Sequence, residues 1–145
     1  MKEETYKIIG ILIFGIGFFI VFAAIFLFSM QDMSAKIDIS NESIQLDGFI
    51  HDTVDFDEIN KIEYLDDFEI HGGKKGAGFS NNGYFSGDAD FKDIGQCRAY
   101  VYYHEKYFVV MYTDEETIIF NEKSEEETKD IYNTLLDKKQ KDDKQ

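Results

Sequence analysis

The sequence predicts an α+β protein, mainly β, with one membrane-spanning helix followed by a small β-domain that a C-terminal helix closes. Three observations support this prediction. Residues 8–30 contain no charged side chain, residues 34–120 alternate short polar and apolar runs, and residues 124–139 have the apolar spacing of an amphipathic helix. A chain of 145 residues has room for one ordinary domain besides the membrane segment.

The apolar segment at residues 8–30 is long enough to cross a bilayer. As a helix it would extend about 34 Å, against a hydrocarbon core of about 30 Å. A cleaved signal peptide is the alternative, but its apolar region would have only about 7–15 residues before a small-x-small cleavage site. The sequence SMQDMSAKID at the end of the segment has no such site. We therefore predict an uncleaved transmembrane helix, preceded by a short segment at residues 1–7.

Charge is concentrated outside the transmembrane segment. Residues 1–7 sum to zero, so the formal net charge of −14 belongs to residues 31–145. Such an acidic surface repels nucleic acid and anionic lipid headgroups, and we expect no nucleic-acid partner. Lys2 and Lys7 before the segment outnumber Lys36 after it, which favours a C-terminal domain outside the cell.

Small residues recur within the transmembrane segment. Gly10, Gly17 and Ala24 are seven residues apart, so they lie on nearly one helix face. This face predicts weak self-association or contact with a partner helix, because small residues let two helices approach closely. Glycine is common in membrane helices, so the pattern also fits a helix that has no partner.

The rest of the chain predicts short β-strands joined by polar turns. Alternation, or a high content of β-branched and aromatic residues, marks the expected strands: residues 36–39, 44–46, 59–64, 97–104, 107–113 and 117–120. The short break at Glu105 and Lys106 predicts a hairpin between two of these strands. Short strands separated by polar turns predict an antiparallel sheet or barrel.

One amphipathic helix is predicted at residues 124–139. Ser124 and Glu127 have the spacing of a capping box. The apolar positions that follow have helical spacing: Thr128, Ile131, Tyr132, Leu135 and Leu136. This stripe predicts that one face of the helix packs onto the sheet. Residues 138–145 are expected to form a solvated, charged tail.

The order of these parts resembles a pleckstrin-homology (PH) domain, in particular the bacterial PH-like domains attached to membrane segments in Gram-positive bacteria. The resemblance covers about residues 35–137 and rests on these stretches: IDISNESIQLDGF, FDEINKIEYLDD, GAGFSNNGYFSG, GQCRAYVYYHEKYFVVMYTDEETIIFN and SEEETKDIYNTLL. It implies a partly open antiparallel β-barrel capped by the C-terminal helix, with the PH-like domain at residues 31–137. It also implies a binding or assembly module in a bacterial cell membrane rather than an enzyme.

Residues 71–87, HGGKKGAGFSNNGYFSG, are unusually rich in glycine. Gly73 and Gly78 have the glycine spacing of a phosphate-binding P-loop, but Phe79 and Ser80 follow where the motif requires Lys and then Ser or Thr. The dinucleotide-binding pattern fails as well, so we expect no nucleotide site. The stretch instead predicts a long glycine-rich hairpin, in which glycine supplies the turns.

A ligand-binding role for this hairpin stays open. Two lysines and neighbouring glycine amides could hold an anion, a lipid headgroup or an envelope-active peptide, as in an immunity protein. The candidate residues are Lys74, Lys75, Gly76 and Gly78.

The sequence has no recognisable catalytic or metal site. His51, His71 and His104 lack metal-ligand spacing, and residues 88–95 have the wrong residues for a calcium loop. Cys97 lies in a strand-like run, where a buried, unreactive thiol is the usual case. We therefore predict a protein that is not an enzyme and needs no cofactor.

Aromatic residues are dense in the later strands. Four of them are candidates for an exposed face that binds a protein or peptide: Tyr100, Tyr102, Tyr103 and Tyr107. Ordinary packing inside a barrel is the alternative. The leading prediction is a membrane-anchored binding module whose partner is a membrane or envelope protein, bound through this face or through the edge of a sheet.

Overall fold

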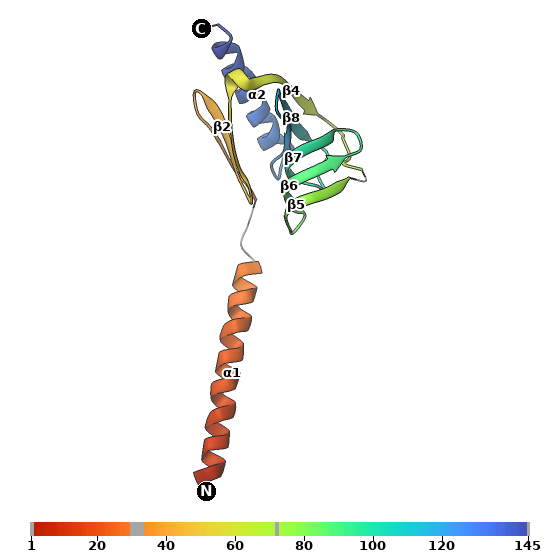
Figure 1. The fold of residues 1–145 in the computed structure, drawn as a ribbon. Coiled ribbons are helices and arrows are strands. Elements are labelled where there is room, and N and C mark those ends of the chain that lie inside the picture. Colours follow the sequence, from red (N-terminus) through yellow and green to blue (C-terminus); the bar gives the residue numbers. More distant parts are fainter. Residues whose placement is uncertain (1, 30–33, 72, 145) are drawn as a thin grey trace. The chain divides into compact units, whose positions relative to one another are not determined.

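A computed structural model describes residues 2–29, 34–71 and 73–144 of the chain (Figure 1). The chain divides into two units, Met1–Asp32 and Met33–Gln145. Each unit has its own internal structure.

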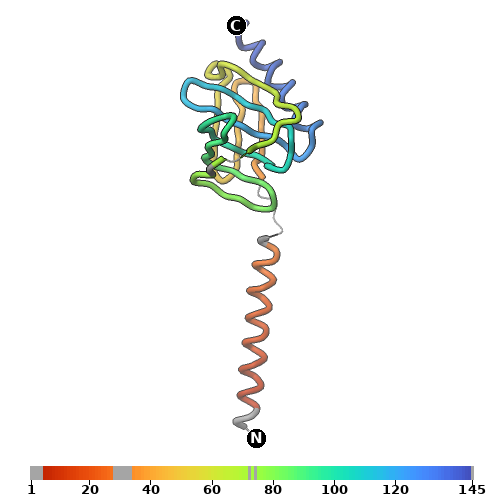
Figure 2. The backbone as a smooth tube through the Cα atoms, turned by 90° about the vertical axis from the view of Figure 1, so that its right-hand side faces the viewer, coloured from red at the N-terminus to blue at the C-terminus, as the bar shows by residue number. Residues whose placement is uncertain are grey.

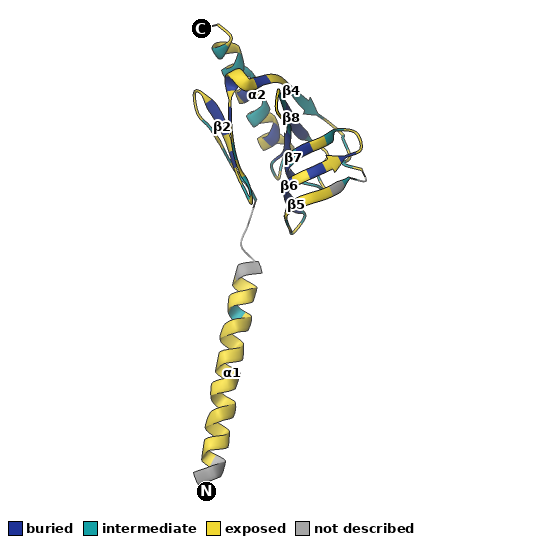
Figure 3. Cartoon of the chain, viewed as in Figure 1, coloured by how far each residue is buried: buried dark blue, intermediate teal, exposed yellow. Residues whose placement is uncertain are grey.

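The described part of the first unit is one helix, α1 (Lys2–Ser29). Its segment Thr5–Leu27 is long and apolar enough to cross a membrane, with a mean hydropathy of 3.0. None of the residues in this segment is buried (Figure 3). Large apolar side chains such as Phe14 and Phe19 therefore point outward, as they must in a helix that is surrounded by lipid.

The second unit contains two β-sheets (Figures 1 and 2). The smaller sheet is antiparallel in the order β1-β2-β3, and its strands are β1 (Lys36–Ile39), β2 (Ser43–Asp47) and β3 (His51–Asp55). The larger sheet has the order β4-β8-β9-β7-β6-β5. Its strands are β4 (Ile59–Leu65), β5 (Lys74–Asn81), β6 (Tyr84–Phe91), β7 (Gly95–Tyr102), β8 (Phe108–Thr113) and β9 (Thr117–Phe120). The two sheets do not close into one ring, so the predicted, partly open barrel is confirmed.

The main core lies between the two sheets. It is built from alternate residues of the facing strands together with one residue of the C-terminal helix: Ile44, Leu46, Val54, Phe56, Ile59, Tyr84, Tyr100, Val109, Met111, Ile118, Phe120 and Leu135. Phe56 belongs to a short 3₁₀ turn, η1 (Phe56–Glu58), that leads from the smaller sheet into the larger one. Burial of these side chains is the main force that holds the sheets together.

The C-terminal helix α2 (Glu125–Asp142) begins at the predicted cap. The Ser124 Oγ accepts a hydrogen bond from the Glu127 amide at 3.2 Å, which satisfies one of the free donors in the first turn. Thr128 and Leu135 are buried on the face of the helix that the sequence predicts. The helix continues to Asp142, three residues beyond its predicted end at residue 139, and none of residues 138–144 is buried.

The outer face of the larger sheet is covered as well. A second core lies there: Phe85, Ala89, Phe91, Cys97, Ala99, Val101, Phe108, Val110 and Ile119. The β4–β5 connection contributes Phe68, whose ring packs edge-on against Phe108 with centroids 6.1 Å apart. Lys106 holds this connection through ion pairs to Asp67 and Glu69. With both faces covered, the central strands are apolar on both sides, which explains their continuous apolar runs.

The predicted hairpin at Glu105 and Lys106 is wrong. β9 lies between β7 and β8, so these two strands are not neighbours. β9 is antiparallel to β8 but parallel to β7. The β7–β9 pair is therefore the one parallel pair among the described strands of an otherwise antiparallel sheet. β7 and β8 are buried on both faces, and the short apolar strand β9 pairs with an edge of each.

The predicted glycine-rich hairpin is confirmed, and two strands form it. β5 and β6 pair on either side of a turn at Asn82 and Gly83, which have φ angles of 46° and 83°. Both angles are left-handed, as a two-residue type I′ turn requires, and Asn-Gly suits them. At Gly87, with φ of 150°, a Cβ atom would lie 2.3 Å from the Ala77 carbonyl oxygen, so glycine permits close approach of the strands.

Candidate functional site

The free edge of β5 is the first feature of the candidate site. β5 is the last strand in the order of the larger sheet, and no other strand in the described part of the chain pairs with its outer edge. Residues 75–78 and Ser80 are exposed. A register shift between Lys75 and Gly78 marks a bulge, and the ladder is regular from Gly78 to Asn81. An edge of this kind presents unpaired backbone N–H and C=O groups to another chain.

The other sheet edges are less open. β4, at the opposite edge of the larger sheet, packs against α2. β1 and β3 have only four and five residues, whereas β5 has eight. β5 is therefore the longest edge that is not covered by a helix.

An aromatic pair, with one exposed and one half-buried ring, lies beside the regular half of β5. Phe49, in the turn between β2 and β3, is 61% exposed, and it is the one exposed large apolar side chain outside α1 among the described residues. Its ring stacks on that of Phe79 with centroids 6.2 Å apart. The Phe49 amide donates to the Ser86 Oγ at 3.1 Å, which fixes the turn against the larger sheet.

A cavity of about 670 Å³ adjoins the other half of β5. Residues from three strands and one turn line it: Gly76 in β5, residues 88–90 in β6, residues 96–98 in β7, and residues 113–117 at the β8–β9 turn. Its charged lining consists of Asp88, Asp90, Asp114, Glu115, Glu116 and Arg98. Five carboxylates against one guanidinium make the cavity strongly acidic.

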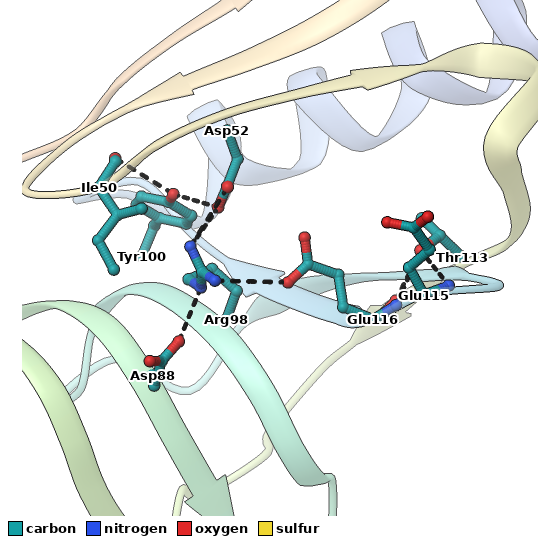
Figure 4. Close-up of polar contacts among 8 residues, drawn as sticks. All are labelled: Ile50, Asp52, Asp88, Arg98, Tyr100, Thr113, Glu115 and Glu116. Atoms are coloured by element: carbon teal, nitrogen blue, oxygen red, sulfur yellow. Dashed lines mark hydrogen bonds and ion pairs between the residues drawn. The ribbon is translucent and has the colours of Figure 1, made fainter.

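Arg98 is the centre of an ion-pair network in this cavity (Figure 4). Its Nη1 lies 3.3 Å from both carboxylate oxygens of Asp52, in the smaller sheet. Its Nε lies 2.9 Å from Asp88 Oδ1, and its Nη2 lies 3.8 Å from Glu116 Oε2. The side chains of Arg98 and Asp52 are only 22% and 15% exposed. One guanidinium therefore joins the two sheets and neutralises part of the acidic lining.

Tyr100 supports the same network from the core. Its hydroxyl donates to Asp52 Oδ2 at 2.5 Å and lies 3.2 Å from the Ile50 carbonyl oxygen. Burial raises the pKa of Tyr100 well above its usual range, and the Asp52 carboxylate adds to this effect, so the hydroxyl remains a donor. Burial also raises the pKa of Glu116, as does the nearby charge of Asp52, while Arg98 opposes the shift.

Three of the four predicted ligand residues of the glycine-rich stretch have different surroundings in the structure. The Lys75 ammonium lies over the ring of Tyr103, 4.0 Å from its centroid, and 5.2 Å from that of Phe85. Such cation–π contacts hold Lys75 against the outer face of the sheet. Gly76 lines the acidic cavity instead, and Gly78 pairs with Gly87. Lys74 lies opposite Asp90 in register, and its side chain is outside the described part of the structure. Anion binding here stays a prediction.

The four candidate tyrosines do not share one exposed face, so that expectation was wrong. Tyr100 is 1% exposed, and it lies with Tyr102 on the core side of β7. Tyr103 packs with the outer core, and the Tyr107 hydroxyl donates to Glu105 at 2.7 Å. The reason is the alternation of a strand, which sends successive side chains to opposite faces.

The remaining candidate residues lie apart from one another. His51 contacts Asp47, His71 contacts Glu69, and His104 packs on the Tyr103 ring. Cys97 is buried in the outer core, and burial raises the pKa of its thiol to about 12. A thiol with such a pKa is not ionised near neutral pH and is a poor nucleophile.

Sequence reasoning missed the residues that shape the site. Arg98 is the only arginine in the chain, and it lies in an otherwise apolar strand, which is a usable signal for a buried ion pair. Asp52 and Phe49 gave no such signal, because the strand β3 was not predicted. Their roles follow from packing between two sheets.

Comparison with known proteins agrees with the fold. The family model described as a bacterial PH domain matches residues 33–135, which include both sheets and most of α2. No curated protein and no solved structure matches the chain. The family match spans well over half of the sequence and begins after the apolar helix. The chain therefore belongs to the bacterial PH domain family.

Proposed function

We propose that this chain is a single-pass membrane protein whose PH domain binds an extended segment of another protein by adding it as a strand to β5. The observation that carries this proposal is the exposed, unpaired edge of β5. In strand addition, backbone hydrogen bonds supply affinity, while neighbouring side-chain contacts supply specificity. The stacked rings of Phe49 and Phe79 beside this edge provide an apolar contact of that kind.

The membrane helix has a clear energetic role in this proposal. The regular half of β5, Gly78–Asn81, offers a ladder of about two to four hydrogen bonds, which contributes roughly 1–4 kcal/mol. That is weak for two partners that diffuse freely. Two proteins held in one membrane meet at a much higher effective concentration, so a short ladder is sufficient. The partner is therefore a membrane or envelope protein.

The rest of the proposal follows from the family and the charge pattern. PH-like domains are generally binding modules without catalysis, and we propose the same for this chain. Lys2 and Lys7 favour an N-terminus inside the cell, which places the domain outside a bacterial cell membrane. The formal charge of −14 keeps the domain away from anionic headgroups.

Photocrosslinking in intact cells tests the proposal. A photoreactive amino acid replaces Ser80, which is exposed on β5, and in a matched control it replaces Lys129, which is exposed on α2. We expect the Ser80 probe to form a distinct adduct whose partner peptide, identified by mass spectrometry, is one contiguous segment. Identical adducts at both positions, or none at Ser80, would contradict strand addition at β5.

A further inference from the structure

We propose that the segment bound along β5 is basic, and that a lysine or arginine side chain of this segment enters the acidic cavity beside Gly76. This inference deepens the proposed strand addition at β5 and rests on it. The cavity and the edge strand are one continuous surface, because Gly76 belongs to both.

The geometry brings an added strand within reach of the cavity. Strands in a sheet lie about 4.8 Å apart, so a chain paired with β5 lies about 10 Å from β6. Gly76 has no side chain between that chain and the cavity. A Cβ atom at Gly76 would lie 3.1 Å from the Asp88 carbonyl oxygen and 3.2 Å from the Asp88 Cβ, so the backbone of β5 at Gly76 lies directly against Asp88 in the cavity lining. A long, flexible, positively charged side chain can extend across this gap.

The negative charge of the cavity lining favours a positively charged side chain from the bound segment. Five carboxylates and Arg98 give the described lining a formal charge of −4. The Arg98 guanidinium is already engaged by Asp52, Asp88 and Glu116. An acidic side chain entering here would be repelled, and a basic one would relieve repulsion among the carboxylates.

Two of the carboxylates can be changed without disturbing Arg98. Asp90 and Glu115 line the cavity, and no ion pair between them and Arg98 is found among the described side chains. The variant Asp90→Asn with Glu115→Gln removes two charges from the cavity and keeps the shape of both side chains. The control Asp130→Asn with Asp137→Asn removes two charges from the exposed face of α2.

Selection from a displayed peptide library tests the inference. The full chain is embedded in phosphatidylcholine nanodiscs, and random eight-residue peptides displayed on phage are selected against it. We expect enriched peptides to carry lysine or arginine. Synthetic copies of these peptides should bind the cavity variant about three- to tenfold more weakly at low salt, bind the α2 control with little change, and lose most of this difference at about 0.5 M NaCl.

The outcomes separate the two proposals. Hydrogen exchange of residues 74–81 is measured with and without each selected peptide. Peptides that protect β5 but are neutral or acidic, or that bind the cavity variant equally well, overturn the inference and leave strand addition intact. Failure to select any peptide that protects β5 also overturns the inference, because only the contact in the cavity would make a free peptide bind tightly enough to be selected. Strand addition itself is tested separately by the Ser80 crosslink in intact cells, where both proteins share one membrane.

Discussion

Replacing Arg98 by methionine should strongly destabilise the PH domain. The change keeps an apolar stem of similar length but removes the guanidinium that contacts Asp52, Asp88 and Glu116. Asp52 is only 15% exposed, so its carboxylate would remain in the structure without a positive partner. Loss of one partner from a fully buried ion pair costs about 3–5 kcal/mol. Because Asp88 and Glu116 are more exposed and water screens them, we expect about 2–3 kcal/mol here.

The assay is urea unfolding of the full chain in detergent micelles, followed by tyrosine fluorescence because the chain has no tryptophan. In a thermal unfolding scan of the same sample, a loss of about 2–3 kcal/mol should lower the Tm of a domain of this size by about 8–12 °C. Lys106→Met is the matched control, because Lys106 forms its ion pairs with the exposed carboxylates of Asp67 and Glu69. We expect the control to lose less than about 1 kcal/mol.

A double variant checks the physical reason. Asp52→Asn removes the carboxylate charge that Arg98→Met leaves unpaired, but it keeps an oxygen that can accept the hydrogen bond from the Tyr100 hydroxyl. In the Arg98→Met background it should restore at least half of the lost free energy of unfolding. The reasoning is refuted if Arg98→Met is no more destabilising than Lys106→Met, or if Asp52→Asn restores nothing.

Three further predictions concern separate features. Burial raises the folded-state pKa of Glu116, so this carboxyl opposes folding above that pKa and stops doing so below its unfolded pKa of about 4.3. Glu116→Gln should therefore stabilise the domain at pH 7.5 in urea unfolding, and a gain that persists below pH 4 would disprove this cause. Ser124→Ala removes the side chain that accepts the hydrogen bond of the Glu127 amide, and it should lower the free energy of unfolding by about 1 kcal/mol in the same assay. An unchanged free energy of unfolding would contradict this role of Ser124. If the glycine-rich stretch binds an anion, Lys74→Glu with Lys75→Glu should abolish retention of inorganic phosphate in equilibrium dialysis. Equal retention by both forms would rule out that role.

Local patterns predicted much of this fold. The uncharged run at residues 8–30, the cap at Ser124 and the alternating strands each depend on neighbouring residues, so a single sequence reveals them. The resemblance to PH domains, which rests on the order of strands and helix, supplied the prediction of a partly open barrel. The apolar run, the cap and the alternation are local properties, which short stretches of chain determine without long-range packing.

Long-range pairing explains what could not be predicted. β7 and β8 look like a hairpin in sequence, but β9 comes from further along the chain and inserts between them. The glycine-rich stretch forms the hairpin that the sequence predicts, but the place of β5 at the edge of the sheet depends on which strands pair elsewhere. Arg98 and Asp52 meet only because two sheets face each other, and no local pattern relates residues 46 positions apart.

The most direct test of strand addition is residue-resolved hydrogen exchange across β5 in the full chain, with and without a bound partner segment. The outer edge of a strand exposes the backbone groups of every second residue. Strand addition at Gly78–Asn81 therefore predicts new protection at alternate amides of β5, with no change at the β4 edge beside α2. Protection that is absent from β5, uniform along it, or confined to another surface would contradict the account.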